Sequence, residues 1–465
     1  MPPRSLSRRD FLSAIGGASA AAATGALWAA EPPRQPNIVL IVADDLGYDD
    51  LGSESATDLR TPHIDALAAG GVRFSDGYVN CPVCSPSRAG LITGRYPQEF
   101  GYEVNPPSDL SAIPANFGLP LRQRTIANHL QKLGYATGLI GKWHLGAGEK
   151  FRPLHRGYDE FFGFLHGSRS YYQEGANPSN PLWDNDRRVE EREYLTDAFA
   201  RKAVSFVERH RNQPFFLHLA FNAVHSPMQA PPRNYLERFG HINNLVRKRF
   251  AAMLAAMDDG VGRVLQGIRR RRLEDDTLVI FISDNGGTAR AGHPLKKTVQ
   301  GGKGSLHEGG IRVPFIMRWP GNITAGSVYR QPVSAMDILP TILAAVGALP
   351  YKPADGVNLL PHLQQTLSDA PHEVLYWKYT NQSAVRKGNW KLLSRFPDEP
   401  PMLFDLSVDQ MEQYDLAAAQ PVRASELADL LNIWKARLPK PLWDFAPAHT
   451  AEGDEAVTSE DPSNE

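Results

Sequence analysis

The sequence has very little cysteine: among its 465 residues only Cys81 and Cys84 carry a thiol. A fold of this size is therefore not built on a framework of disulfide bonds. Neither sign of charge dominates, because 50 Lys and Arg are balanced by 51 Asp and Glu, for a formal net charge of −1. This balance gives no reason to expect nucleic acid or a membrane surface as a partner. Beyond the N-terminal segment, no apolar run is long enough to span a bilayer.

Both ends of the chain have compositions typical of segments outside a folded domain. Arg8 and Arg9 stand in Ser-Arg-Arg-Asp-Phe-Leu, which resembles a twin-arginine export motif, and a weakly apolar stretch rich in Ala and Gly follows as far as Ala30. We therefore predict that residues 1–30 are a signal peptide and that the protein is exported to the periplasm or secreted. The acidic stretch 448–465 contains no Lys or Arg and is predicted to be disordered.

The middle of the chain alternates between apolar runs and helical patterns. Runs that suit strands buried on both faces occur at 37–43, 136–140, 215–221, 277–283 and 311–319. Helical patterns occur at 125–133, 244–270 and 335–346. Strands that alternate with helices predict an α/β fold, here a large α/β/α sandwich around a mostly parallel mixed sheet, which we assign to residues 36–365.

The pattern changes in the region of 361–371, where short strand candidates follow one another. These strand candidates lie at 373–379, 383–386, 390–395 and 402–405, and a helical pattern covers 422–438. We predict a small C-terminal α+β subdomain over residues 366–447, with an antiparallel sheet and one packing helix. Its aromatic residues Trp377, Tyr379 and Trp390 would either pack in the core or stack on a sugar.

Pairs of polar residues follow two of the predicted strands. Asp44 and Asp45 end the run 37–43, and Asp284 and Asn285 end the run 277–283. In open α/β sheets, ligands gather beyond the carboxyl ends of the strands. Acidic pairs brought together there would repel one another unless a cation lay between them. Carboxylate and amide oxygens are hard ligands, so the sequence predicts a site for Ca²⁺ or Mg²⁺ rather than for a soft metal.

The segment that begins at Cys84 carries the most specific motif of the chain. It reads Cys-Ser-Pro-Ser-Arg-Ala-Gly-Leu-Ile-Thr-Gly over 84–94 and resembles the signature of the type I sulfatases, in the alkaline phosphatase-like superfamily. The segment Gly-Lys-Trp-His-Leu-Gly at 141–146 resembles the second signature of that family. The resemblance extends over roughly residues 36–440. It implies a sulfuric ester hydrolase whose Cys84 is oxidised to formylglycine by a formylglycine-generating enzyme.

The resemblance also assigns roles to individual residues. The implied metal ligands are Asp44, Asp45, Asp284 and Asn285, together with an oxygen derived from Cys84. The implied catalytic residues besides Cys84 are Arg88, Lys142, His144, His225 and Lys303. In the implied mechanism a hydroxyl of the hydrated aldehyde attacks sulfur, with Asp284 accepting its proton. His225 or Lys303 protonates the leaving alcohol, and His144 deprotonates the second hydroxyl so that sulfate departs.

The same residues also fit other interpretations. Cys81 and Cys84 form a C-x-x-C pattern, which occurs in redox and zinc sites, but no second Cys pair completes a zinc site. If Cys84 is converted, Cys81 becomes the only thiol of the chain. A phosphonate or phosphate ester hydrolase of the same superfamily is the alternative enzyme. A non-catalytic carbohydrate-binding member is the alternative outside the enzymes.

The substrate is the least specific part of the prediction. Many members of the resembled family desulfate polysaccharides and glycosaminoglycans. This habit of the family and the export signal favour a sulfated saccharide over a simple small-molecule sulfate ester, without indicating which sugar or which position carries the sulfate. His293, which follows Asp284 and Asn285, is a candidate for the substrate pocket, and so are the residues that follow the motif of 154–163, namely His166, Ser168, Arg169 and Tyr171. Loops set such specificity, and a single sequence defines them poorly.

Overall fold

The computed structural model describes residues 35–54, 56–172, 180–288 and 298–445. The predicted signal peptide at 1–30, the predicted acidic tail at 448–465 and His293 lie outside the described residues. Within the described ranges, none of the helices combines the length and the apolar character needed to cross a membrane.

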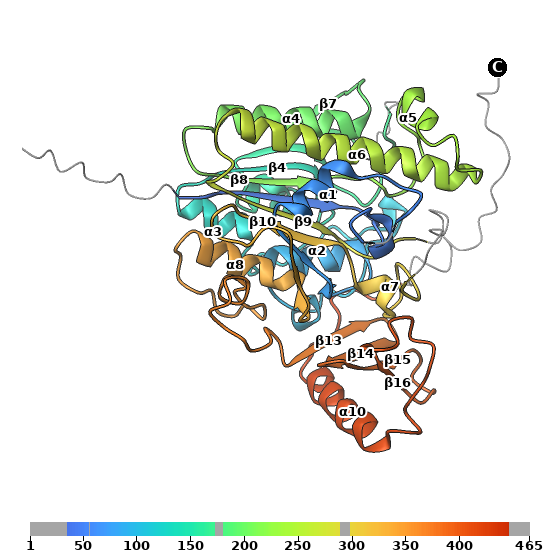
Figure 1. The fold of residues 1–465 in the computed structure, drawn as a ribbon. Coiled ribbons are helices and arrows are strands. Elements are labelled where there is room, and N and C mark those ends of the chain that lie inside the picture. The colour runs from blue at the N-terminus through green and yellow to red at the C-terminus, as the bar shows by residue number, and fades with distance from the viewer. Residues whose placement is uncertain (1–34, 55, 173–179, 289–297, 446–465) are drawn as a thin grey trace, which may run out of the picture. The chain divides into compact units, whose positions relative to one another are not determined.

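A 10-stranded mixed sheet runs through the described part of the chain (Figure 1), in the order β11-β2-β10-β9-β1-β8-β4-β5-β6-β7. Its central strands are parallel: β9 (Thr277–Ser283), β1 (Asn37–Ala43), β8 (Phe215–Ala220), β4 (Ala136–Lys142) and β5 (Glu160–Phe164). The outer strands are β10 (Phe315–Arg318), β2 (Val72–Phe74), β11 (Ser327–Tyr329), β6 (Leu182–Asp184) and β7 (Arg187–Val189). Strands β10 and β6 join the parallel centre in antiparallel fashion. The predicted mostly parallel mixed sheet is confirmed.

Alternation along β1 explains why helices cover both faces of the sheet. Ile38, Leu40 and Val42 face one apolar core, while Val39 and Ile41 face another. The first core also contains residues of α2 (Cys84–Thr93), α3 (Ile126–Lys132) and α8 (Ile338–Ala345). The second contains residues of α1 (Pro62–Ala69), α4 (Leu195–Arg209) and α6 (Leu245–Arg270), which lie across the sheet from α2 and α8 in Figure 1. This is the predicted α/β/α sandwich.

Shorter elements connect these layers. They are β3 (Gly77–Tyr78) and β12 (Val333–Ser334), which pair with each other, and the helices α5 (Arg233–Glu237), α7 (Glu308–Ile311) and α9 (Leu360–Leu363). Single turns of 3-10 helix occur at Tyr48–Asp50, Pro97–Phe100, Leu110–Ala112, Glu149–Phe151, Pro153–His155 and Ala335–Asp337.

The predicted helices and strands agree best with the structure where a helix cap or a fully buried apolar run defines their bounds. Thr125 caps α3 by accepting a hydrogen bond from Asn128 N, and Asn244 caps α6 in the same way from Arg247 N at 2.9 Å. The predicted strand at 311–319 is wrong at its start, because Ile311 ends helix α7 and strand β10 begins only at Phe315. Helices α2 and α4 were not predicted; α4 is amphipathic, with charged residues on its outer side.

The C-terminal strands form the predicted small antiparallel sheet. It consists of β13 (Val374–Tyr379), β14 (Gln382–Lys387), β15 (Trp390–Ser394) and β16 (Met402–Asp405), and α10 (Pro421–Ala436) packs against it. Side chains alternate between its faces. Leu375, Trp377 and Ala384 pack into the core that α2 and α8 share, while Val385 and Leu392 pack against α10.

Trp377 therefore belongs to the core rather than to a sugar-binding surface. Its ring is 2% exposed, and its indole Nε1 donates to Val79 O at 2.7 Å. The Trp390 ring is covered by the Arg423 guanidinium, which lies 4.3 Å from its centroid. These contacts support the packing interpretation for both tryptophans.

An ion pair joins the segment before β13 to the turn before α8. His372 Nε2 lies 2.8 Å and 3.0 Å from the two carboxylate oxygens of Asp337, and the side chain of Asp337 is fully buried. Burial alone would lower the pKa of His372, but the Asp337 carboxylate outweighs it and raises the pKa above the ordinary value of 6.5.

This pair should make stability depend on pH in a defined direction. Because the folded-state pKa of His372 is raised, its contribution is fully present below pH 6.5 and is lost as the pH rises through the raised pKa. We expect His372→Gln to lower the free energy of unfolding by about 1.5–3 kcal/mol in the acidic range, and by less at alkaline pH. Urea unfolding of both proteins across this range measures the difference. A difference that does not change with pH would contradict the prediction.

Candidate active site

The two polar pairs predicted from the sequence meet at one edge of the large sheet. Strands β1 and β9 are parallel neighbours, with Ala43 opposite Ser283, so the residues that follow them emerge side by side. Asp45 N donates to Asp284 Oδ1 at 3.2 Å, and Asn285 Nδ2 donates to Asp45 Oδ1 at 2.7 Å. Asp45 adopts a positive φ of 61°, which turns the chain directly after the strand. All four side chains are buried.

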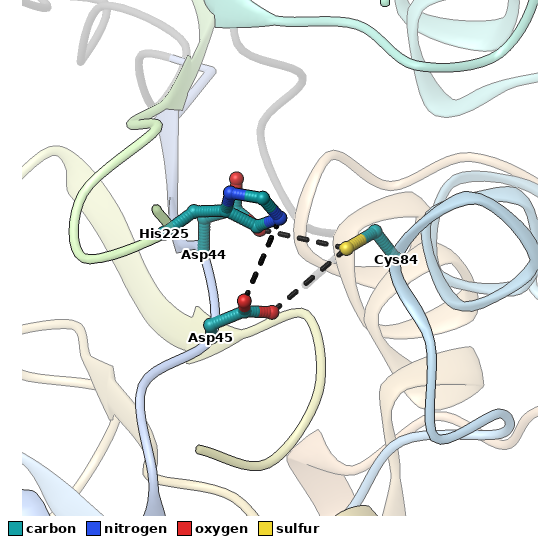
Figure 2. Close-up of side chains that lie close together, drawn as sticks. All are labelled: Asp44, Asp45, Cys84 and His225. Atoms are coloured by element: carbon teal, nitrogen blue, oxygen red, sulfur yellow. Dashed lines mark hydrogen bonds and ion pairs between the residues drawn. The ribbon is translucent and has the colours of Figure 1, made fainter. Parts of the chain in front are cut away.

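Cys84 lies at the first position of α2 and points at these carboxylates (Figure 2). Its Sγ is 3.6 Å from Asp44 Oδ1 and 3.9 Å from Asp45 Oδ1. His225, which follows β8, places Nε2 3.6 Å from Asp45 Oδ2. Ligand atoms of these four residues all lie within 4.8 Å of one another. Residues from three separate segments of the chain thus converge on one small volume.

Three cationic side chains surround the carboxylates. Lys142, the last residue of β4, places Nζ 2.6 Å from Asp44 Oδ2, and Lys303 places Nζ 2.9 Å from Asp45 Oδ2. Arg88 stands one helical turn after Cys84 on α2, and its Nε lies 2.8 Å from Asp284 Oδ2. Each of the three side chains is at most 6% exposed. Charges buried so deeply are tolerable only because they are paired.

The charges of the site shift the protonation of its members. Burial tends to raise the pKa of Asp44 and Asp45, but the neighbouring cations, Lys142 for Asp44 and Lys303 for Asp45, hold both below the ordinary value. Burial and the nearby Asp44 raise the pKa of Asp284 to about 6. Burial also raises the pKa of the Cys84 thiol above its ordinary value, despite the two lysines. An unmodified Cys84 is therefore protonated at neutral pH and is a poor nucleophile.

The two histidines are held through their backbones and neighbours. His144 follows β4 with a positive φ of 59°, and its carbonyl accepts a hydrogen bond from Ser85 Oγ at 2.6 Å. His225 Nδ1 lies 2.6 Å from the carbonyl of Ser226, which fixes the orientation of the ring. Burial lowers the pKa of both imidazoles, so each is neutral at pH 7. Among the described residues, His144 Nδ1 has no hydrogen-bond partner.

The donor set fits a hard divalent cation. Asn285 Oδ1 is buried but has no hydrogen-bond partner within the described part of the chain, whereas its Nδ2 is satisfied. A buried carbonyl oxygen left in this state costs free energy unless a further group binds it. Together with the oxygens of Asp44, Asp45 and Asp284, it offers the ligand type that Ca²⁺ and Mg²⁺ prefer. The fit agrees with the predicted cation site.

The candidate substrate-binding residues differ in how far they are exposed and in what they contact. Ser168 is exposed and its hydroxyl donates to Ser226 O at 3.0 Å, beside His225. His166 is half-buried, and the adjacent Gly167 lies against the His144 ring, where a Cβ would approach within 2.8 Å. Tyr171 is 1% exposed and donates to the carbonyls of Asn222 and His225, so it supports the site and does not line a pocket. His293 lies outside the described residues.

Two supporting contacts, made by Asn105 and Ser85, were not predicted from the sequence. Asn105 Oδ1 accepts a hydrogen bond from Ser85 N at 2.8 Å, so it caps the N-terminus of α2 from a distant loop. Ser85 Oγ bonds both to the carbonyl of His144 and, at 2.8 Å, to Tyr102 Oη. Ser85, the unspecified position of the C-x-P-S-R motif, thus connects α2 to His144. Only the position of Ser85 inside the motif could have drawn attention to it.

Comparison with known proteins agrees with this geometry. A family model described as "Sulfatase" matches residues 36–348, and one described as "N-sulphoglucosamine sulphohydrolase, C-terminal" matches residues 302–433. Human arylsulfatase A is 35% identical, with 91% of this chain and 92% of that protein aligned. The chain belongs to the sulfatase family. It is accordingly a sulfuric ester hydrolase, and the resemblance inferred from the motifs is confirmed.

Other similar proteins extend the comparison for this sulfatase. Human N-acetylgalactosamine-6-sulfatase is 34% identical, with 77% of this chain and 71% of that protein aligned. The crystal structure of Ps i-CgsB in complex with k-i-k-neocarrahexaose superposes with a TM-score of 0.83 at 35% identity, covering 90% of this chain and 96% of that one.

Proposed function

We propose that this sulfatase hydrolyses sulfate esters of a carbohydrate, with Cys84 converted to formylglycine and a divalent cation bound beside it. One observation carries the proposal. Cys84 is 1% exposed, lies 3.6 Å from Asp44, and is surrounded by paired Lys142, Lys303 and Arg88. Burial raises the pKa of its thiol, so the unmodified residue would be a poor nucleophile. The surroundings suit an anionic ester far better than they suit thiol chemistry.

The proposed cation ligands are the oxygens of Asp44, Asp45, Asp284 and Asn285, with an oxygen of the converted residue 84. Ca²⁺ and Mg²⁺ are the candidates because all these donors are hard oxygens, and we propose Ca²⁺ as the first to test. When bound, the ion supplies positive charge toward the sulfate oxygens. Support comes from the buried Asn285 Oδ1, which has no hydrogen-bond partner among the described residues, and from the four acidic or amide side chains that share one edge of the sheet.

The proposed roles of the other residues follow from their charges and from their distances to the carboxylates of the site. The hydrated formylglycine supplies the attacking oxygen, whose proton passes to Asp284, and the second hydroxyl that later releases sulfate. Lys142, Lys303 and Arg88 bind the nonbridging oxygens of the ester and offset their negative charge. Lys303 Nζ, which approaches Asp45, donates a proton to the leaving alcohol, and His225 Nε2 takes this role only when the ring is protonated. His144, neutral because burial lowers its pKa, accepts the proton of the second hydroxyl.

A sulfated saccharide is the proposed substrate class. Two similar proteins support it: one is named for the 6-sulfate of N-acetylgalactosamine, and the other was crystallised with k-i-k-neocarrahexaose. The exposed Ser168 and the half-buried His166, near His225 and His144, are proposed to contact the sugar that carries the sulfate.

We expect sulfate to be released from a sulfated saccharide with a kcat/KM at least about 100-fold higher than for the matching phosphate or phosphonate ester. Ion chromatography of released sulfate, over a panel of sulfated mono-, oligo- and polysaccharides, measures it. Aryl sulfate, phosphate and phosphonate esters serve as comparison substrates, and the Cys84→Ala protein provides the background rate. Faster hydrolysis of the phosphonate ester would instead support the alternative activity of the superfamily. Release from aryl sulfate alone would contradict the saccharide proposal.

A further inference from the structure

We propose that the small C-terminal sheet positions Lys303, and that Gln382 is the positioning residue through which it does so. The inference rests on the proposed role of Lys303 in binding the sulfate ester. Lys303 belongs to a loop of the large domain, between β9 and β10, whereas Gln382 begins strand β14 of the small sheet. Contacts between these two segments connect the C-terminal sheet to the reaction centre.

Gln382 binds the backbone of the Lys303 loop with both ends of its side-chain amide. Its Nε2 donates to Gly304 O at 2.9 Å, and its Oε1 accepts from Leu306 N at 3.1 Å. Gly304 directly follows Lys303 in the chain. A single side chain thus fixes two peptide groups that are separated by one residue, beginning at the neighbour of the proposed sulfate-binding lysine.

The loop needs such external contacts because its own sequence is permissive. Lys303 lies between Gly302 and Gly304, and Gly301 precedes Gly302. Gly301 and Gly304 have positive φ angles of +79° and +84°. Glycines on both sides leave the backbone many alternative conformations, which must be excluded by contacts from outside. Two further contacts hold the loop: Lys303 N donates to Gly287 O at 2.9 Å and Gly304 N donates to Pro82 O at 2.9 Å. The loop is therefore held by the Cys84 and Asp284 segments as well as by the small sheet.

A second contact of the small sheet region reaches the same loop further along. Glu412 Oε2 accepts from Glu308 N at 2.6 Å, and Lys391 Nζ lies 2.9 Å from Glu308 Oε1 and 2.8 Å from Glu412 Oε1. The three side chains are at most 1% exposed. Removing one charge from such a buried group would leave another uncompensated and disturb folding. Gln382, which is neutral and only half-buried, is therefore the residue to change.

Val385 provides a matched control. It lies on the same strand as Gln382 but at the opposite parity, so it faces α10 and packs with Leu392 and Leu403. Val385→Ala weakens the small sheet by removing buried apolar atoms, without a contact to the Lys303 loop. Any effect that Gln382→Ala has beyond that of Val385→Ala reports the amide contacts and not general loss of stability.

We expect Gln382→Ala to lower kcat/KM for the sulfate ester by about 10- to 100-fold, because small displacements of a binding group cost rates of this order. Val385→Ala should keep the wild-type kcat/KM at temperatures where it remains folded. In the Lys303→Ala background, Gln382→Ala should cause no further loss. An equal loss in both backgrounds would show that Gln382 does not act through Lys303, and wild-type kcat/KM in Gln382→Ala would overturn the inference.

A charged variant adds a pH readout. The carboxylate of Gln382→Glu still accepts from Leu306 N but opposes the carbonyl of Gly304, whereas its protonated form can donate to that carbonyl. Relative to wild type, the kcat/KM of Gln382→Glu should therefore rise as the pH falls through the pKa of the introduced carboxyl. A ratio to wild type that stays flat with pH would count against the proposed hydrogen bond.

Amide hydrogen exchange tests the contact without any turnover. Peptides that cover residues 299–311 should exchange faster in Gln382→Ala than in wild type and Val385→Ala. Unchanged exchange overturns the inference whatever the activity. If wild-type protein released no sulfate from any ester while exchange still accelerated, the proposed function would fail and the positioning of the loop would stand.

Discussion

Cys84→Ala is expected to abolish sulfate release, with kcat lowered by about 10⁴-fold or more, as happens when the nucleophile of a covalent mechanism is removed. The physical reason is the position of residue 84, whose side chain points into the group formed by Asp44, Asp45 and His225. Alanine leaves the cationic side chains in place but removes the atom that attacks sulfur. The rate of sulfate release from the best substrate of the panel measures the effect.

Cys81 is the matched control, because it is the other buried thiol and lies three positions earlier. Cys81→Ala should reduce stability by creating a small cavity, yet retain the wild-type kcat. Mass spectrometry of the wild-type peptide that contains residue 84 should show replacement of the thiol group by an aldehyde. The unfolded wild-type protein should then titrate only the thiol of Cys81. Full activity in Cys84→Ala, or an intact Cys84 thiol in fully active protein, would exclude the formylglycine mechanism.

Removal of the divalent cation should be the second large effect. We expect chelation to lower the rate of sulfate release by about 10³-fold, since a bound cation contributes several kcal/mol of charge stabilisation. The protein should nevertheless stay folded. Lys142, Lys303 and Arg88 already lie 2.6 to 2.9 Å from the carboxylates of Asp44, Asp45 and Asp284, so their charges remain compensated.

Calcium or magnesium added to the chelated protein should restore activity and raise the unfolding temperature, because a ligand that binds only the folded state stabilises it. Sulfate release and thermal unfolding measure the two effects, and the ion that restores more activity at equal concentration identifies the cofactor. Asp258→Asn is the control. Asp258 belongs to a second cluster of carboxylates and histidine within the described ranges, with His63 and Asp259, and accepts hydrogen bonds from the backbone of α1. It should leave the response to cations unchanged, whereas Asp45→Asn should weaken it. Activity that withstands complete chelation would contradict the proposed metal site.

Much of the large sheet was predictable because its central strands are apolar along their whole length. The run at 37–43 is buried at every position, and so is the run at 277–283, so both were identified without tertiary information. The antiparallel strand β10 was misplaced because Ile311 and Val313 are as apolar as Phe315, although they belong to a short helix and a connection. Helix α4 was missed because its apolar residues are interrupted by charged ones, whose role becomes clear only when the outer face is known.

The residues of the site could likewise be identified from the sequence, but the residues that hold them in place could not. The two acidic pairs end predicted strands, and the cysteine signature is contiguous, so these groups could be named in advance. Gln382 is 78 residues from its partner Gly304, and Asn105 caps a helix that it does not precede. Nothing local distinguishes such a Gln or Asn from an exposed polar residue, because a hydrogen bond between distant segments has no sequence period.

The sequence alone therefore determined the layers of the fold, the family signature and the chemical types of the groups that meet at Cys84. The tertiary structure decided how these groups are charged and held. It brought Asp44, Asp45 and Asp284 within reach of Lys142, Lys303 and Arg88, and it buried them together, so that their pKa values differ from those of the free side chains. It also placed the small sheet against the Lys303 loop. Charge interactions and hydrogen bonds depend on distances in space, and these are fixed only when strands far apart in the chain become neighbours.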